Sequence, residues 1–244
     1  MSAQRAGGAV DLRVAGMSRL SSVDWPGKLV STVFLQGCPW DCFYCHNPAL
    51  IDPRTAGTLP WSKVWQHLTR RVGLLDGVVF SGGEPTMQHA LPDAVAAVRG
   101  LGFGVGLHTG GAYPSRLESL LPKLDWIGLD IKATSANYEQ VVGRPGASDR
   151  AWQSLGMIIA EQQRRGDDAP LGLEVRTTVH SAAVDEHDLD ELSARLAEAG
   201  VRTWALQRFR DTGTRDVLPR VTAPGRRVDL DGVDDDRFEQ VIRR

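Results

Sequence analysis

Short apolar runs alternate with longer amphipathic segments along most of this chain. The β-branched run at residues 29–35 predicts a buried strand, whereas residues 61–72 place Val64, Leu68 and Val72 on one face of a helix. The same pattern predicts further strands at residues 77–80, 104–107, 126–131, 171–179 and 204–209. It predicts further helices at residues 91–101, 115–121, 151–165 and 188–199, with a last helix at Phe238.

These elements make about six strand–helix units, which favours a parallel sheet with right-handed crossovers. Six units are too few for a closed barrel of eight strands. We therefore expect a partial, open (β/α)6 barrel of the α/β class, with its chemistry at the carboxyl ends of the strands. We expect a single domain over residues 1–244 with its core at residues 15–213. Pro, Gly, Arg and Asp crowd residues 211–236, so the tail at residues 214–244 is expected to be irregular.

Composition narrows the classes of function. Hydrophobic residues make up 42% of the chain and charged residues 24%, which is the balance of a globular protein with a sizeable core. The net charge of −2 does not indicate a nucleic-acid or membrane-surface partner. No apolar run approaches the ~18–20 residues that span a bilayer, and residues 1–10 contain no apolar signal core. We therefore expect a cytoplasmic protein.

All three cysteines of the chain, Cys38, Cys42 and Cys45, lie close together after a predicted strand. An odd number at such close spacing is not a disulfide framework and indicates metal or redox chemistry in a reducing compartment. Three thiolates spaced C-x3-C-x2-C can bind three irons of a [4Fe–4S] cluster. Since no fourth cysteine exists, one iron would stay open to a ligand, as at catalytic metal centres.

Other interpretations of this loop stay open at this point. The segment from Cys42 to His46 matches the C-x-x-C-H of covalent haem attachment, although that chemistry needs an exported protein and leaves Cys38 unexplained. A structural zinc site with three cysteines and His46 would require the adjacent Cys45 and His46 to converge on one ion. A thioredoxin-like redox pair and three unrelated buried cysteines are the remaining alternatives.

The cysteine spacing, with an aromatic residue before the third cysteine, resembles the signature of the radical S-adenosylmethionine (SAM) superfamily. Within that superfamily the chain is similar to the activases of glycyl radical enzymes, and most to those of anaerobic (class III) ribonucleoside-triphosphate reductases. The similarity extends over roughly residues 15–213. Its segments are DWPG at 24–27, FLQGC at 34–38, YCHNP at 44–48, LHTGG at 107–111, GLDIK at 128–132, EVRTTVH at 174–180 and WALQRFR at 204–210.

The resemblance implies a [4Fe–4S] cluster on Cys38, Cys42 and Cys45, with SAM chelating the open iron. One electron from the cluster would cleave SAM to methionine and a 5′-deoxyadenosyl radical. That radical would take a hydrogen atom from a glycine of a partner enzyme. The implied partners are a glycyl radical enzyme, with a class III ribonucleotide reductase as the first candidate, and a reduced flavodoxin or ferredoxin-type electron donor.

A glycine-rich turn after the second predicted strand is a candidate for the SAM site. Residues 81–85 read SGGEP, and glycines at such a turn let a ligand approach the backbone closely. By resemblance, Gly82, Gly83 and Glu84 hold the amino group of SAM. Tyr44 and Trp40 could shield the cluster or stack on adenine, and core packing explains them equally well.

Charged residues at later strand ends complete the predicted site. Asp130 and Lys132 are alternate residues of one strand, so both side chains can face one cavity; a surface ion pair is the structural alternative. By resemblance they surround SAM together with Thr109. Arg176 lies in a later predicted strand, where a buried guanidinium needs a partner that the SAM carboxylate or ribose would supply; an ordinary salt bridge at the strand end is the structural alternative.

Three further residues at strand ends are candidates for the site. His108 stands where related activases often carry a carboxylate, so a cation ligand and a packed, hydrogen-bonded histidine are equally consistent with it. His180 and Arg210 end the following strands and are additional candidates.

Alternative functions within the superfamily are an activase of another glycyl radical enzyme, such as the pyruvate formate-lyase type, and an enzyme acting on a small molecule, such as a deazapurine synthase. A non-catalytic metal-binding or electron-carrier module is the alternative from a different class. Release of 5′-deoxyadenosine discriminates, because a carrier does not consume SAM.

Overall fold

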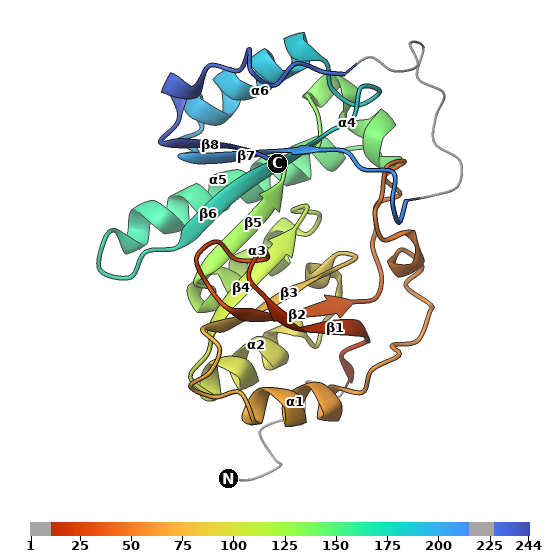
Figure 1. Cartoon of the computed structure of the whole chain (residues 1–244), viewed down its shortest axis with the longest axis vertical. Coiled ribbons are helices and arrows are strands. Elements are labelled where there is room, and N and C mark those ends of the chain that lie inside the picture. Colours follow the sequence, from red (N-terminus) through yellow and green to blue (C-terminus); the bar gives the residue numbers. More distant parts are fainter. Residues whose placement is uncertain (1–10, 215–226) are drawn as a thin grey trace.

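A computed structural model describes residues 11–214 and 227–244, and these form one sheet with strands in the order β1 to β8. The strands fan from β1 at one end of the molecule to β8 at the other (Figure 1). Their bounds are β1 Val14–Ser21, β2 Val30–Leu35, β3 Gly77–Gly82, β4 Gly104–Thr109, β5 Trp126–Asp130, β6 Gly172–Val179, β7 Thr203–Arg208 and β8 Gln240–Arg243.

Strands β2 to β7 lie in sequence order and all pair in parallel, with helical connections between them. Within the described ranges β1 and β8 do not pair with each other, so the barrel is open. The six parallel strands and the partial barrel predicted from the sequence are confirmed. Parallel pairing with helical crossovers brings the carboxyl ends of six strands to one edge.

The parallel strands are buried on both faces, because helices cover the outer face and side chains fill the inner one. Every residue of β2 except one is buried, as are the first four residues of β3. Both segments consist mostly of apolar or β-branched residues, which explains why the sequence predicted them correctly. Helices α1 and α2 lie at the β1 end of the sheet and α6 at the β8 end (Figure 1).

The α-helices are α1 Trp61–Thr69, α2 Leu91–Gly100, α3 Pro114–Leu120, α4 Ser135–Val142, α5 Ala147–Arg165 and α6 Glu186–Glu198. Short 3-10 turns occur at Pro48–Leu50, Pro85–Met87, Leu121–Lys123 and Asp235–Arg237. Helix α4 was not predicted from the sequence; it has only eight residues and buries just Tyr138, Val141 and Val142. Too few apolar positions recur in so short a helix to reveal its period. The helix ends at Gly143, whose φ of 65° is the left-handed conformation that glycine supplies.

The two outer strands were not predicted. In β1, Gly16, Ser18 and Ser21 interrupt the apolar alternation, and two register shifts break its antiparallel pairing with β2. The helix expected at Phe238 is wrong. A 3-10 turn at Asp235–Arg237 leads instead into β8, which pairs in parallel with β7. The expected irregular tail therefore contains a strand, while residues 215–226 lie outside the described residues.

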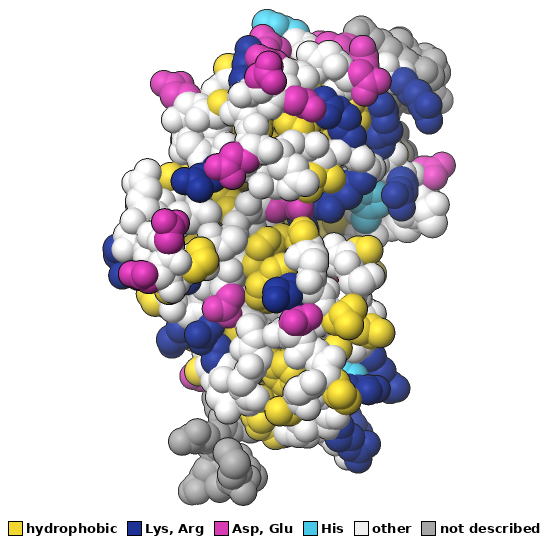
Figure 2. Space-filling view, turned by 60° about the vertical axis from the view of Figure 1, so that its left-hand side comes forward, with side chains coloured by type: hydrophobic (Ala, Val, Ile, Leu, Met, Phe, Trp, Pro, Cys, Tyr) yellow, Lys and Arg dark blue, Asp and Glu magenta, His cyan; other side chains and the backbone are white. Residues whose placement is uncertain are grey.

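Phe238 packs against Trp204 of β7, with ring centroids 5.5 Å apart, and the backbone after it adds to the edge of the sheet. Among the described residues no helix is both long and apolar enough to cross a membrane. Acidic and basic side chains are interspersed over the face drawn in Figure 2.

Candidate functional site

The cysteine loop leaves the carboxyl end of β2 and is tied down on two sides. The amides of Gly37 and Cys38 donate to the carbonyls of Leu50 and Ile51, at 2.8 and 3.0 Å. Farther along, the amides of Asp41 and Phe43 donate to the carbonyls of Val142 and Val141 in α4, at 2.9 and 3.1 Å. The helix that the sequence did not reveal thus holds the middle of this loop.

A cavity of about 210 Å³ opens where β2 to β7 end. All the site residues predicted from the sequence line this cavity. They are Cys38, Cys42, Tyr44, Cys45, Gly82, Gly83, Glu84, Thr109, Asp130, Lys132 and Arg176. The fold therefore brings together segments that are up to 138 positions apart, the difference between 176 and 38. Their assignment to individual roles stays a prediction.

The cavity wall also contains residues that the sequence analysis did not propose. Thr178 follows Arg176 by two positions on β6, and Gln207 lies near the end of β7. The period of two in a strand could have indicated Thr178. His180 and Arg210 do not line the cavity. His180 packs between aromatic rings, 4.6 Å from Phe209, and the carbonyl of Arg210 contacts the ring of His46 at 2.9 Å.

The three cysteines are free thiols, and the surroundings of Cys38 and Cys42 disfavour ionisation. Burial, with the nearby carboxylate of Glu84, raises the pKa of Cys38 to about 12. Burial also raises the pKa of Cys42, although Lys132 opposes the shift. Metal ligands must be thiolates, so binding iron here would release protons and supply the positive charge that the thiolates need.

Among the described residues, no three His, Cys, Asp or Glu side chains surround one point as the ligands of a single ion. In an iron–sulfur cluster each cysteine binds its own iron, so the three sulfur atoms need not converge. Three thiols on one loop, facing one cavity, fit a cluster as a donor set better than they fit a single zinc ion.

Gly82 and Gly83 are required by backbone packing. An added Cβ on Gly83 would lie 2.3 Å from the carbonyl oxygen of Gly37, and one on Gly82 would lie 2.3 Å from the amide of Leu35. Gly82 also has a φ of 114°, which glycine alone adopts readily. The turn after β3 therefore packs directly against the start of the cysteine loop. This packing requires glycine at both positions, whether or not a ligand is bound.

Glu84 joins two strand ends through four hydrogen bonds. Its Oε1 accepts from the amide and hydroxyl of Thr86, at 3.1 and 2.6 Å, and from the hydroxyl of Thr109 at 2.7 Å, while Oε2 accepts from the amide of Gly110 at 2.9 Å. The side chain is 2% exposed, and this burial raises its pKa despite the four donors. The carboxylate therefore fixes the β3 and β4 ends around the cavity, and only Oε2 retains capacity for a ligand.

Asp130 and Lys132 form an ion pair in the cavity wall, with Nζ and Oδ2 3.0 Å apart. Burial opposes both charges, but Lys132 and then Arg176 lower the pKa of Asp130 below its usual value. Burial alone would lower the pKa of Lys132. The negative charge of Asp130 outweighs this effect, so the pKa of Lys132 lies well above its usual value. Both side chains are charged at neutral pH, which offers a ligand one donor and one acceptor group.

Arg176 forms an ion pair within the protein, which is the structural alternative that its place in a strand left open. Its Nε donates to Oε1 of Glu174, two positions earlier on β6, at 2.7 Å. The guanidinium lies 5.1 Å from the ring of Trp126 and rests against Gly128, where an added Cβ would lie 2.7 Å from its central carbon. The buried arginine therefore has an ion-pair partner within the protein through Nε, while it still borders the cavity.

His108 is a hydrogen-bonded histidine in the cavity wall. Its Nε2 lies 2.8 Å from the carbonyl oxygen of Asp24, which can only accept, so Nε2 carries the hydrogen. Nδ1 then accepts from the hydroxyl of Ser81 at 3.1 Å. Burial, and after it the charge of Arg176, lower the pKa of His108 to about 4.

This pKa predicts a pH-dependent stability. Between pH 6.5 and about 4 the unfolded chain binds a proton at His108 that the folded protein excludes, so stability is full above pH 6.5 and falls as the pH decreases. We expect His108→Gln to remove roughly 3 kcal/mol of this pH dependence. Urea unfolding of both proteins at pH 4 to 7 measures it. Parallel curves for the two proteins would contradict the assignment, and the other histidines cancel in the difference.

Two buried polar atoms in the cavity wall lack a partner within the described ranges. They are Oη of Tyr44 and Nε1 of Trp40, and each side chain is 3% exposed. A buried donor without a partner is costly, and a bound ligand is one means of satisfying it. Together with the free thiols, these atoms fit a cluster and a polar organic cofactor in this cavity.

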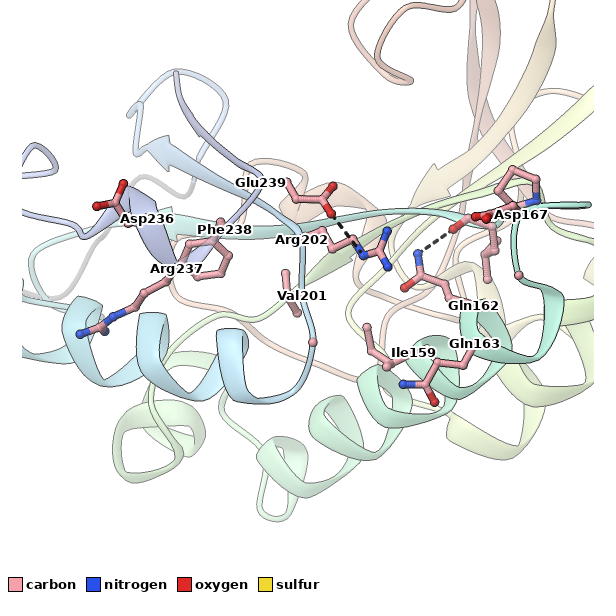
Figure 3. A pocket seen from close by; sticks show the side chains of 14 residues that line it. Ile159, Gln162, Gln163, Asp167, Val201, Arg202, Asp236, Arg237, Phe238 and Glu239 are labelled. Atoms are coloured by element: carbon pink, nitrogen blue, oxygen red, sulfur yellow. Dashed lines mark hydrogen bonds and ion pairs between the residues drawn. The ribbon is translucent and has the colours of Figure 1, made fainter.

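Hollows larger than this cavity lie elsewhere on the molecule. A hollow of about 700 Å³ lies at the amino ends of β6 to β8, between the end of α5 and the segment before β8 (Figure 3). Arg202 points to Glu239 across it, with Nε and Oε1 3.5 Å apart (Figure 3). Its described lining contains no cysteine or histidine. Sites of α/β barrels lie at the opposite, carboxyl ends of the strands, where the chemistry gathers here.

The family model described as "Radical SAM superfamily" matches residues 32–174, which is more than half of the chain. The chain belongs to the radical SAM superfamily. The matched residues include the cysteine loop, the Gly82–Gly83 turn and Asp130, so the family match rests on the same cavity wall.

Two curated relatives support the membership. A "Putative glycyl-radical enzyme activating enzyme" of Methanocaldococcus jannaschii is 26% identical over 201 residues, covering 80% of this chain and 79% of that protein. A "Pyruvate formate-lyase-activating enzyme" of Clostridium pasteurianum is 30% identical over 157 residues, covering 60% of this chain and 66% of that protein.

Solved structures of radical SAM proteins share the fold. QueE of Escherichia coli superposes with a TM-score of 0.53 at 18% identity, covering 87% of this chain and 91% of QueE. SuiB of Streptococcus suis bound to S-adenosylmethionine superposes with a TM-score of 0.53 at 14% identity. It covers 75% of this chain, which spans only 42% of SuiB.

Proposed function

We propose that this radical SAM enzyme is the activase of a glycyl radical enzyme, and that its target is an anaerobic (class III) ribonucleoside-triphosphate reductase. The observation that carries the proposal is the single cavity in which the three cysteines meet the Gly82–Gly83 turn and the Asp130–Lys132 pair. The relative from Methanocaldococcus jannaschii, which bears the name of such an activase and matches along most of both chains, supports the first half.

In this proposal Cys38, Cys42 and Cys45 hold a [4Fe–4S] cluster whose fourth iron binds SAM. When bound, the cluster would supply the one electron that cleaves SAM to methionine and a 5′-deoxyadenosyl radical, and that radical would take a hydrogen atom from a glycine of the partner. The electron comes from a reduced flavodoxin or ferredoxin-type donor in the cytoplasm.

The protein's own contribution is to bind and orient SAM. Gly82 and Gly83 keep the turn low against the cysteine loop, and Oε2 of Glu84 accepts from the SAM ammonium group. Asp130 and Lys132 supply an acceptor and a donor for its polar groups. Tyr44, whose hydroxyl has no partner among the described residues, contacts the nucleoside from the cysteine loop.

Electron paramagnetic resonance of an anaerobic mixture tests the proposal. The protein is reconstituted with iron and sulfide, reduced, and mixed with SAM and a class III ribonucleotide reductase. We expect a glycyl radical doublet, split by the α-hydrogen. When the reductase carries α-deuterated glycine, we expect deuterium in the released 5′-deoxyadenosine.

Matched partners separate the alternatives. A doublet with pyruvate formate-lyase, and none with the reductase, would correct the target and keep the activase. Release of 5′-deoxyadenosine without any doublet would reject the activase and favour a peptide or small-molecule substrate. A "PqqA peptide cyclase" of Methylobacterium sp. is 31% identical over 167 residues, so a peptide substrate is the second candidate.

A further inference from the structure

A buried carboxylate behind the cavity wall is shared by two arginines that are far apart in sequence. Glu174 of β6 is 1% exposed, and its Oε1 accepts from Nε of Arg176 at 2.7 Å and from a terminal nitrogen of Arg244 at 2.6 Å. The second oxygen, Oε2, is buried without a partner among the described residues. A buried carboxylate depends on such partners, because an uncompensated charge in the interior is expensive.

Arg244 reaches Glu174 because β8 joins the edge of the sheet. Directly after β8, the amide of Arg244 donates to the carbonyl of Leu206 at 3.0 Å, and its own carbonyl accepts from the amide of Arg208 at 2.7 Å. The ladder with β7 therefore fixes the backbone of Arg244. Its side chain, about a third exposed, points inward to the barrel.

A second contact connects Arg244 to the cavity. With the amide of Gln207 oriented so that its oxygen faces Arg244, this oxygen accepts from two nitrogens of the guanidinium, each at 3.2 Å. Gln207 and Arg176 both line the cavity, whereas Arg244 does not. Arg244 thus supports two wall residues from behind.

The group formed by Glu174, Arg176 and Arg244 carries a net charge that bears on the cavity. The charge of Arg176 balances that of Glu174, so with Arg244 the three side chains carry one net positive charge. Arg176 also faces Asp130, whose pKa it lowers, so its guanidinium belongs to the electrostatics of the cavity. A guanidinium binds well only when its planar donors are held in one orientation.

We propose that Arg244 is a positioning residue of the SAM site, which acts through Glu174 and Gln207 to hold Arg176 in its orientation toward the ligand. This inference rests on the proposed function only in taking SAM as the ligand of this cavity. It gives the last strand of the sheet a part in cofactor binding, although β8 contributes no residue to the cavity wall.

The adjacent arginine provides a matched control. Arg243 lies next to Arg244, but its guanidinium turns to the other side and pairs with Asp235, with a nitrogen and Oδ1 2.6 Å apart. Arg243→Gln and Arg244→Gln remove the same charge from adjacent positions, the last residue of β8 and the residue after it. Only the second substitution removes a contact to Glu174.

Equilibrium binding of labelled SAM to the reconstituted full chain, without any partner enzyme, is the measurement. We expect Arg244→Gln to raise the Kd for SAM about tenfold and Arg243→Gln to change it less than twofold, with Arg244→Lys intermediate. Equal Kd values for Arg244→Gln and the unaltered protein would overturn the inference. A matching loss in Arg243→Gln, with both melting temperatures lowered, would also overturn it, since that marks a general weakening of β8.

A double-mutant cycle tests whether Arg244 acts through Arg176. If it does, Arg176→Gln combined with Arg244→Gln binds SAM no more weakly than Arg176→Gln alone. Additive losses would overturn this route. Since no partner enzyme is involved, a missing glycyl radical would reject the proposed function and leave this result standing. Absence of SAM binding by the unaltered chain would overturn both.

Discussion

Replacement of Cys42 by alanine is expected to abolish iron–sulfur reconstitution and SAM cleavage together. The chain has only three cysteines, so no other thiol can take the place of the lost ligand. Cys42 is buried among the residues of the cavity wall, and its removal would leave two thiolates for a cluster that needs three. Iron and sulfide content, the absorbance of the reconstituted protein and 5′-deoxyadenosine release measure the effect.

His46→Ala is the matched control for Cys42→Ala. His46 follows the third cysteine directly, and its Nε2 lies 2.9 Å from the carbonyl of Arg210. If the loop holds a cluster on three cysteines, this variant keeps its iron, its sulfide and its SAM cleavage. Loss of one metal equivalent in both variants, with no sulfide in either, would instead indicate a zinc site of three cysteines and one histidine.

The second large effect is expected from Gly83→Ala, a change of one methyl group. The new Cβ would lie 2.3 Å from the carbonyl oxygen of Gly37 and 2.9 Å from that of Leu50, and backbone atoms cannot rotate away as a flexible side chain would. We expect the free energy of unfolding to fall by about 3 kcal/mol, at the upper end of the usual cost of overpacking. Urea unfolding of the cluster-free protein measures it without any cofactor.

Gly156→Ala controls for the substitution itself. Gly156 lies within α5, is exposed, and an added Cβ there meets nothing within 4 Å. Alanine in an exposed helix interior is expected to stabilise by about 0.5–1 kcal/mol. A small effect at Gly83, similar in size to that at Gly156, would show that the turn can separate from the cysteine loop. The close packing of these two segments would then be incorrect.

The strands of the sheet differ in how far their own sequences reveal them. The strands β2 to β7 were predictable because each contains a short cluster of apolar or β-branched residues between turns or amphipathic helices. The outer strands were not, because β1 contains Gly16 and two serines, and β8 has only four residues. Both depend on a neighbour already in place, whose unpaired edge supplies the hydrogen bonds.

Glu84 and Arg176 show the same limit within the site. The sequence indicated both as residues around SAM, and both line the cavity. It did not indicate that Glu84 binds Thr109 and Gly110, or that Arg176 binds Glu174. Each of these side chains was expected to bind the ligand, and each already forms hydrogen bonds within the protein. Both therefore also stabilise the wall of the cavity.

By itself the sequence determined the cysteine spacing, the alternation of strands and helices, and hence the position of the chemistry at the carboxyl ends of parallel strands. These properties are local, because a spacing or a period involves only a few neighbouring residues. Only the tertiary structure decided that His108 binds the carbonyl of Asp24 and that Arg244 reaches Glu174 across 70 positions. Such contacts depend on which strands become neighbours and in which register, and the register is set by the packing of the whole sheet.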